Sequence, residues 1–302
     1  MNGNGSAAVA VVMAPAKLNL ALLVGPQRPD SFHEIASVMV PITLADRVVV
    51  GRTPGAGLDV QCAVAPGEQN LAAKLVRELE ARLERTFDVC VKIDKHIPAG
   101  GGLGGGSSDA AATLIALERL FALELSPRLR YDAAAAVGSD VPFFLWPGPQ
   151  LVMGRGQVLK ELELPPLDFV VAMPDLGLST AAVYRWRDDD VEVTLKEFPP
   201  RARALSAAVQ GAATVKELVA LVHNDLEASV VKRKPAVGEL RDRLLAEGAL
   251  AAAMTGSGAA VFGIFADEDA ASRARAALAP ARAWCASDLQ LAGRVPKRPR
   301  EG

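Results

Sequence analysis

A dense run of glycines in the middle of the chain is the feature whose residue types most directly suggest chemistry. Six of the seven residues from Gly100 to Gly106 are glycine. Glycine loses more backbone freedom on folding than any other residue, so such a run is costly unless the backbone must approach a ligand or adopt positive φ. Helix formers follow at 110–121, with Leu114 and Leu117 on one face. A glycine loop that enters a helix N-terminus directs unpaired N–H groups at one point, and this predicts a phosphate-binding site.

The surroundings of this run argue against three other kinds of glycine-rich segment. A flexible linker would join polar stretches, whereas this run joins an alternating strand at 87–94 to an apolar helix. The spacing G-x-G-x-x-G is present, but a dinucleotide-binding unit needs a strand after its helix. Residues 126–138 instead predict a second helix, with Ser126 as N-cap and Gly138 as its stop. A Walker A loop would need Gly-Lys-Ser/Thr where Ser107-Ser108 stands.

Phosphoryl transfer also needs a cation and a group that orients or deprotonates the attacking hydroxyl. Lys17 lies in an apolar strand region, and Asp140 lies between a helix stop and the hydrophobic run Phe143–Trp146. Both also have an ordinary explanation, as an outward-facing strand lysine and a turn aspartate. The residues alone leave these alternatives open.

Composition limits the class of protein. The chain has 302 residues, of which 50% are hydrophobic. Its formal net charge of −2 does not indicate binding to nucleic acid. The basic tail Arg294–Arg300 is interpreted as a solvated terminus. Cys62, Cys90 and Cys285 match no metal spacing and indicate reduced thiols. With no signal peptide and no stretch of membrane-spanning length, we expect a soluble cytoplasmic protein.

The elements that must position these residues fall into two halves. The first alternates strand-like runs at 9–13, 17–24, 35–44 and 47–52 with a helix at 71–83, capped by Asn70. The second begins with a strand at 168–174 and has helical segments at 214–233 and 235–247. It ends with strands at 249–254 and 259–265, a helix at 268–278 and a strand at 284–291. This order predicts a split βαβ, ferredoxin-like half, and the fold class is α+β. After the first strand of the second half, Asp188–Asp190 could ligate a metal, but a solvated turn is favoured.

The pattern Pro-x-Gly-Gly-Gly-Leu-Gly-Gly-Gly-Ser-Ser-x-Ala-Ala at 98–111 resembles the phosphate-binding signature of the GHMP kinases (galactose, homoserine, mevalonate and phosphomevalonate kinases). The resemblance implies a two-domain fold, with a ribosomal protein S5 domain 2-like N-terminal domain at 1–160 and a ferredoxin-like C-terminal domain at 161–283. The segment at about 284–302 is expected to pack back on the first domain. The resemblance also implies ATP and Mg²⁺ as cofactors, with the Mg²⁺ ligands unassigned and the Ser108 hydroxyl a candidate.

Further motifs are similar to one branch of that family, which acts on a cytidine-diphosphate-linked methylerythritol in the non-mevalonate isoprenoid pathway. They are PAKLNL at 15–20, RPDSFHEI at 28–35, GSDVPFFL at 138–145 and MTGSGAAVFGIF at 254–265. The implied partner is therefore this small-molecule substrate, with no nucleic acid and no membrane. The chain is expected to be a monomer or weak homodimer.

The resemblance assigns roles to particular residues. Lys17 and Asp140 become the catalytic pair, with Asp140 taking the proton of the attacking hydroxyl. The residues assigned to ATP are Asn70, Lys95, Pro98, Gly100, Gly101, Gly102, Leu103, Gly104, Gly105, Gly106, Ser107 and Ser108. Those assigned to the acceptor are Asn19, Phe32, His33, Thr180, Tyr184, Gly256 and Gly258, with Phe32 and Tyr184 stacking on the cytosine.

The chain departs from the branch at Asp30-Ser-Phe-His33, where Asp-Gly-Tyr-His is common. Serine replaces a glycine, and phenylalanine keeps the stacking face without the hydroxyl. Two other hypotheses use the same glycine loop. One is a GHMP kinase for homoserine, a sugar or a mevalonate derivative, which needs no stacked base. The other is a non-catalytic nucleotide-binding regulator, which typically lacks the lysine or the proton acceptor.

Overall fold

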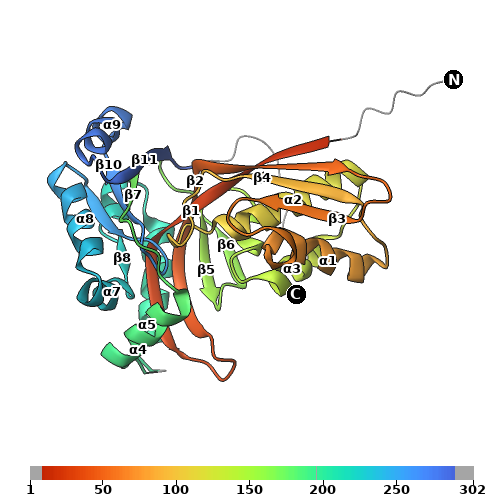
Figure 1. Cartoon of the computed structure of the whole chain (residues 1–302). Helices are drawn as coiled ribbons and strands as arrows, with labels where there is room; N and C mark the ends of the chain where they lie inside the picture. Colours follow the sequence, from red (N-terminus) through yellow and green to blue (C-terminus); the bar gives the residue numbers. More distant parts are fainter. Residues whose placement is uncertain (1–8, 195, 290–302) are drawn as a thin grey trace.

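The computed structural model describes residues 9–194 and 196–289. The basic tail Arg294–Arg300 and the part of the 284–302 segment beyond residue 289 lie outside these ranges. The expected mixed α and β architecture is confirmed, and the described elements gather around two sheets (Figure 1).

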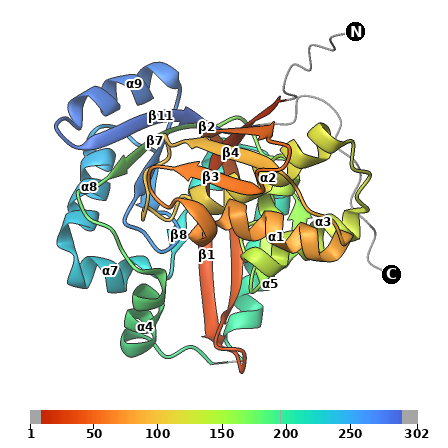
Figure 2. The same cartoon turned by 45° about the vertical axis from the view of Figure 1, so that its right-hand side comes forward.

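Two long antiparallel strands run through the first sheet. The four strands expected between residues 9 and 52 merge into β1 (Val9–Gln27) and β2 (His33–Arg52). Register shifts at Pro15/Ala16 and Asn19/Ala21 let the pair bend without ending. The buried positions of β1 alternate up to residue 14 and are then almost continuous, because both faces are covered there. Figure 2 shows the β1–β2 hairpin projecting between α4 (Thr180–Asp190) and α5 (Phe198–Gly211).

The remaining strands of this sheet extend it on both sides. They are β3 (Leu58–Cys62), β4 (Val89–Asp94), β5 (Gln150–Gly154), β6 (Val158–Glu161) and β8 (His223–Asn224). The order is β3-β4-β2-β1-β8, with β5 pairing both β2 and β6. β3, β5 and β6 were not predicted, since each is only four or five residues long.

Three helices cover one face of the sheet and complete its core. α1 (Leu71–Leu83) and α3 (Pro127–Val137) begin as expected, with side-chain caps from Asn70 and Ser126. α2 (Gly105–Phe121) begins earlier than the helix formers indicated, because its first turn includes Gly105, Gly106 and both serines. Leu75, Leu79, Leu114 and Leu117 pack with the sheet in one buried cluster.

The second sheet confirms the ferredoxin-like prediction. β7 (Asp168–Met173), β9 (Ala251–Met254), β10 (Val261–Phe265) and β11 (Arg282–Ser287) pair in the order β11-β7-β10-β9, all antiparallel. α8 (Pro235–Ala246) ends the long connection from β7 to β9, and α9 (Glu268–Ala277) connects β10 to β11. This is the split βαβ arrangement.

Two predictions in the second half are wrong. The polar passage after residue 185 is largely helical, so Asp188–Asp190 end α4 instead of forming a solvated turn. The helix expected at 214–233 is interrupted, giving α6 (Val215–Val219), β8 and α7 (Glu227–Arg233). The interruption falls where Asn224 Nδ2 donates to the Met254 and Gly256 carbonyls and Asp225 accepts the Val24 N–H.

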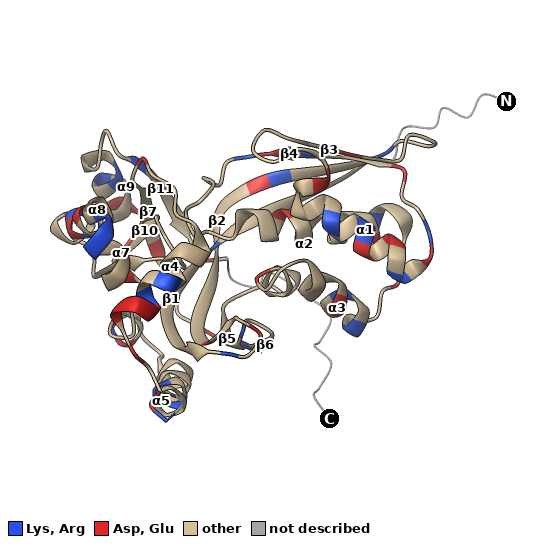
Figure 3. Cartoon of the chain, turned by 60° about the horizontal axis from the view of Figure 1, so that its bottom comes forward, with Lys and Arg blue, Asp and Glu red and all other residues tan. Residues whose placement is uncertain are grey.

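Another buried cluster joins the two sheets. Leu18 and Val40 of the first sheet pack with Phe169, Val171 and Phe262 of the second. β11 belongs to the second sheet, while Asp288 bridges to Ile42 and the Leu289 N–H donates to the Pro41 carbonyl of β2. Outward-facing helices such as α1 and α8 carry both signs of charge (Figure 3). No helix in the described ranges combines the length and apolar character needed to cross a bilayer.

Asp225 links the two halves electrostatically. Its carboxylate accepts the Val24 N–H of β1 at 2.8 Å, Arg201 of α5 at 2.7 Å and His223 Nε2 at 2.7 Å. Burial alone would raise its pKa, but the hydrogen bonds from His223, Arg201 and Val24 lower the pKa to about 2 from the usual 3.8. A carboxyl with a lowered folded-state pKa stabilises the fold above its unfolded pKa and loses that contribution as the pH falls towards 2.

Replacing Asp225 with alanine is therefore expected to lower the free energy of unfolding by about 2–3 kcal/mol, because the buried Val24 N–H loses a charged acceptor and Arg201 and His223 lose their ion pairs. Urea unfolding at pH 7 and at pH 3 measures the free energy of unfolding. On going from pH 7 to pH 3, the variant should lose less of this free energy than the parent protein. Asp242→Ala is the control, since that carboxylate is 62% exposed beside Arg241. Equal effects of the two substitutions would contradict a stabilising role for the Asp225 carboxylate.

Candidate active site

The glycine loop separates two cavities. The larger, of about 760 Å³, is lined by Lys17, Asn19, Phe32, His33, Ser139, Asp140, Arg155, Thr180, Tyr184, Arg185, Asp188, Gly256 and Ser257, among others. The smaller, of about 360 Å³, is lined by Asn70, Lys95, Pro98, residues 100–107 and Asp109, among others. Gly102, Gly104, Ser107 and Thr180 line both cavities. We call the first the acceptor cleft and the second the nucleotide pocket.

Backbone hydrogen bonds hold the loop between the two sheets. The Leu103 carbonyl accepts the Lys17 N–H at 3.0 Å, and the Gly100 and Gly101 carbonyls accept the N–H groups of Ala259 and Ala260 at 3.2 and 3.3 Å. Gly102 has φ +72°, and a Cβ there would lie 2.5 Å from the Thr255 carbonyl oxygen. Glycine is required at this position because both the conformation and the close backbone approach exclude a side chain.

Lys17 lies at the floor of the acceptor cleft and is only 4% exposed. Its Nζ donates to Asn19 Oδ1 at 2.5 Å, and Asn19 Nδ2 donates to Ser37 Oγ at 2.8 Å. Burial lowers the pKa of Lys17, while the nearby negative charge of Asp140 acts to raise it. The same carboxylate acts on Tyr184, whose pKa is raised first by burial and then by Asp140. Asp140 is therefore electrostatically close to both.

The aromatic residues predicted for base stacking lie in the acceptor cleft. Phe32 is 48% exposed at the hairpin, with the Arg155 guanidinium 5.2 Å from its ring centroid. The His33 and Tyr184 rings are 4.9 Å apart, and His33 Nε2 lies 2.9 and 3.0 Å from the two Asp188 oxygens. Ser31 has φ +66°, so this turn does use the left-handed region although a serine occupies it.

The turn that connects β9 to β10 forms the opposite wall. Thr180 Oγ1 and Ser257 Oγ are 2.9 Å apart, and Thr255 Oγ1 accepts the Asn19 N–H at 2.9 Å. Gly256 lines the cleft, and a Cβ there would lie 2.9 Å from Lys17 Nζ. Gly258 is outside the residues that line either cavity, and a Cβ on it would lie 2.6 Å from Met254 Sδ. Its glycine therefore serves packing.

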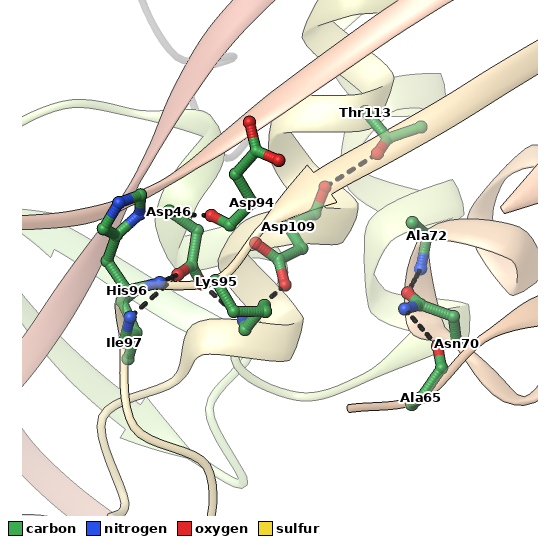
Figure 4. A network of polar contacts seen from close by, with 10 residues as sticks. All are labelled: Asp46, Ala65, Asn70, Ala72, Asp94, Lys95, His96, Ile97, Asp109 and Thr113. Carbon is green, nitrogen blue, oxygen red and sulfur yellow. Dashed lines mark hydrogen bonds and ion pairs between the residues drawn. The ribbon is translucent and has the colours of Figure 1, made fainter. Parts of the chain in front are cut away.

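Lys95 in the nucleotide pocket is held by two buried carboxylates (Figure 4). Its Nζ donates to Asp46 and, at 2.7 Å, to Asp109 of α2. Asp46 is fully buried and also accepts the N–H groups of His96 and Ile97 at 2.5 and 2.8 Å. Burial raises the pKa of Asp109 to about 7, against the lowering effect of Lys95. One network thus fixes the chain on both sides of the glycine loop.

Asn70 and Ser108 are placed differently from Lys95. Asn70 caps α1 through the Ala72 N–H at 2.8 Å and donates to the Ala65 carbonyl, so its side chain is largely occupied (Figure 4). Ser108 is 1% exposed at the start of α2, and its Oγ has no hydrogen-bond partner within the described chain. Asp109 Oδ1 beside it is likewise unpartnered there. In the described ranges, no group of three His, Cys, Asp or Glu residues could hold a metal by itself.

The fold brings almost every residue predicted for the site to one of the two cavities, from segments as distant as Lys17 and Gly256. Sequence reasoning missed the polar residues that support them, namely Asp46, Asp109, Ser139, Arg155, Arg185, Asp188, Asn224 and Ser257. Asp109 directly follows the serines and could have been weighed with Lys95. Ser139 and Ser257 lie inside two of the quoted motifs, and Asp188 lies in the acidic run, so these could also have been considered. The other four residues of this set lie outside those motifs.

Comparisons with known proteins show to which family the chain belongs. The model of the GHMP kinases N terminal domain matches residues 70–148, and that of the GHMP kinases C terminal domain matches residues 204–282. The 4-diphosphocytidyl-2-C-methyl-D-erythritol kinase of Syntrophotalea carbinolica is 39% identical over 90% of this chain and 95% of its own. That of Anaeromyxobacter dehalogenans is 40% identical over 96% of this chain and 92% of its own.

Solved structures give the same result. A crystal structure of 4-(cytidine 5'-diphospho)-2C-methyl-D-erythritol kinase superposes with a TM-score of 0.77 at 36% identity, covering 93% of this chain and all of that one. Homoserine kinase from Cytophaga hutchinsonii superposes with a TM-score of 0.73 at 15% identity over 95% and 96% of the two chains, a likeness of fold alone. The chain belongs to the GHMP kinases and, within them, to the family of the 4-diphosphocytidyl-2-C-methyl-D-erythritol kinases.

Proposed function

We propose that this protein transfers the γ-phosphoryl group of ATP to the 2-hydroxyl of 4-diphosphocytidyl-2-C-methyl-D-erythritol, in the non-mevalonate isoprenoid pathway. The observation that carries the proposal is the placement of Lys17 and Asp140 in a cleft that shares the glycine loop with a second pocket. The aromatic pair Phe32 and Tyr184 in the same cleft supports a nucleobase on the acceptor. A cytoplasmic location belongs to the proposal and is supported by three free cysteines.

The proposed mechanism assigns the chemistry of the cleft to Asp140 and Lys17. Asp140 accepts the proton of the 2-hydroxyl as its oxygen attacks the γ-phosphorus, and the bond to the β-γ bridging oxygen breaks to release ADP. Lys17, held by Asn19, keeps Asp140 ionised and offsets negative charge on the transferring group. A carboxylate is a weak base, but a loose transition state needs little base strength.

The glycine loop is proposed to hold the triphosphate through its N–H groups and the N-terminus of α2. Lys95 and Asn70 line the nucleotide pocket, but each is largely occupied by protein partners. Their proposed contribution is therefore to shape the pocket. The orphaned Ser108 hydroxyl fits a ligand of Mg²⁺, with the remaining ligands supplied by phosphate oxygens. When bound, the ion would neutralise charge on the phosphates.

Purified protein incubated with ATP and a panel of acceptors tests the proposed activity. The cytidylyl acceptor should be phosphorylated at its 2-hydroxyl, whereas homoserine, mevalonate and galactose should be inert. ATP binding without turnover on any acceptor would instead support a non-catalytic regulator.

Substituting Asp140 with asparagine should lower kcat by about 100-fold or more, because the proton acceptor is lost. The dissociation constant for ATP should change little, since Asp140 lines the acceptor cleft and not the nucleotide pocket. Steady-state kinetics and calorimetric ATP titration measure the two effects. Asp132→Asn, in an exposed pair with Arg128, is the control. Wild-type turnover by Asp140→Asn would overturn the assigned mechanism.

Gly104 and Gly106 allow a matched test of how tightly the structure constrains the glycine loop. A Cβ at Gly104, where φ is +72°, would lie 2.9 Å from Phe144 Cζ and 3.0 Å from Lys17 Cγ. At Gly106 the nearest atom would be Leu71 Cδ1, at 3.6 Å. Gly104→Ala should therefore destabilise the protein by about 1–3 kcal/mol, and Gly106→Ala should not. Chemical unfolding decides, and equal stability of the two variants would show that the loop is not constrained as described.

Asp46→Asn should raise the KM for ATP about tenfold, since losing one charge of the buried network frees Lys95 and the loop entrance to shift. The KM for the acceptor should change by less than about threefold. Asp94→Asn is the control, because that carboxylate, drawn near Asp46 in Figure 4, is 37% exposed and pairs with Arg47. A parallel rise in both KM values would contradict a role specific to the nucleotide pocket.

A further inference from the structure

We propose that Asp188 is a positioning residue that fixes the hydrogen-bonding state of His33 and so makes the acceptor cleft select cytosine over uracil. The inference rests on the proposed function, because it takes a pyrimidine nucleotide as the acceptor. It goes beyond that function by assigning the choice of base to a residue on α4 that no sequence motif marks.

The observation behind it is the contact between two distant elements. His33 begins β2 and is 8% exposed, and Asp188 lies near the end of α4. His33 Nε2 faces both carboxylate oxygens of Asp188, at 2.9 and 3.0 Å. Asp188 Oδ1 also accepts from Arg187 NH1 at 3.2 Å, while Arg187 is anchored to the Val24 and Gly25 carbonyls of β1. The carboxylate is thus held in place from its own helix.

This geometry determines which ring nitrogen carries the proton. An ionised carboxylate can only accept hydrogen bonds, so the nitrogen facing it must donate. In a neutral imidazole the other nitrogen is then an acceptor. Asp188 therefore leaves His33 with Nε2 as donor and Nδ1 as acceptor. Without the carboxylate, the neutral ring could adopt either tautomer.

An acceptor nitrogen distinguishes the two pyrimidines. The exocyclic N4 amino group is the hydrogen-bond donor of cytosine, whereas the corresponding O4 of a uracil-type ring is an acceptor. Stacking on Phe32 and Tyr184 is open to either base, because each presents a π face. When uracil is bound, the acceptor Nδ1 of His33 would face the acceptor O4 of the base, and no hydrogen bond would form. Such a mismatch discriminates strongly against the wrong base.

Calorimetric titration with CDP and with UDP tests the inference directly. The protein should bind CDP about tenfold more tightly than UDP, the cost of one mismatched hydrogen bond. Asp188→Ala should reduce this ratio to below about threefold, mainly by weakening CDP. The control is Asp189→Ala, which removes the same charge from the same helix at a residue outside the cleft lining, and it should keep the ratio.

Asp188→Asn separates fixing the tautomer from merely filling space. Its amide has the same shape but can present either oxygen or NH₂ to Nε2, so the ratio should fall as in Asp188→Ala. A structural role would instead weaken both nucleotides equally and be restored by asparagine. Either of those results, or a parent protein that binds UDP as tightly as CDP, overturns the inference.

The outcome also distinguishes this inference from the proposed function. Phosphorylation of the cytidylyl acceptor with no preference for CDP over UDP would refute the role of Asp188 alone. If the protein neither binds CDP nor phosphorylates that acceptor, both are refuted.

Discussion

The structure depends on a small set of backbone hydrogen bonds that hold the glycine loop between two sheets. Leu103 is bound to β1, while Gly100 and Gly101 are bound to the segment entering β10. A loop with so few side chains has little packing of its own, so its conformation comes from these external partners. Because the loop lines both cavities, the same bonds set where a phosphate can lie relative to Lys17.

Buried charge is handled differently on the two sides of this loop. Lys95 has two carboxylate partners, so its charge is compensated within the protein. Lys17 has a neutral amide partner, and burial lowers its pKa against the influence of Asp140. An incompletely compensated ammonium in an accessible cleft favours anions. Of these two lysines, Lys17 is therefore the one that the protein compensates less and leaves more available to an anionic ligand.

The features that could be predicted from the sequence are those that depend on residues close together in the chain. Asn70 and Ser126 cap helices through neighbouring backbone, and the glycine run is contiguous, so these features were predicted correctly. The ferredoxin-like half was predicted because its strands and helices follow one another in order. Asp46 was not found, and the run that contains Asp188 was interpreted as a solvated turn, because the fold brings their partners Lys95 and His33 to them from elsewhere in the sequence. The merging of four expected strands into two also depends on tertiary cover, and a register shift at Pro15/Ala16 accommodates the proline within β1.

The long β1–β2 hairpin has a consequence for how this architecture can diversify. Its base belongs to the first sheet, yet its far end supplies Phe32 and His33 beside Tyr184 and Asp188 of α4 (Figure 2). The proposed base-recognition surface is consequently divided between segments on either side of the chain's midpoint. A chimera that exchanges only one half with a relative would inherit half of a recognition surface. A change of acceptor in such a protein therefore requires paired substitutions in the β1–β2 hairpin and in α4. Exchanging a whole half of the chain is not enough.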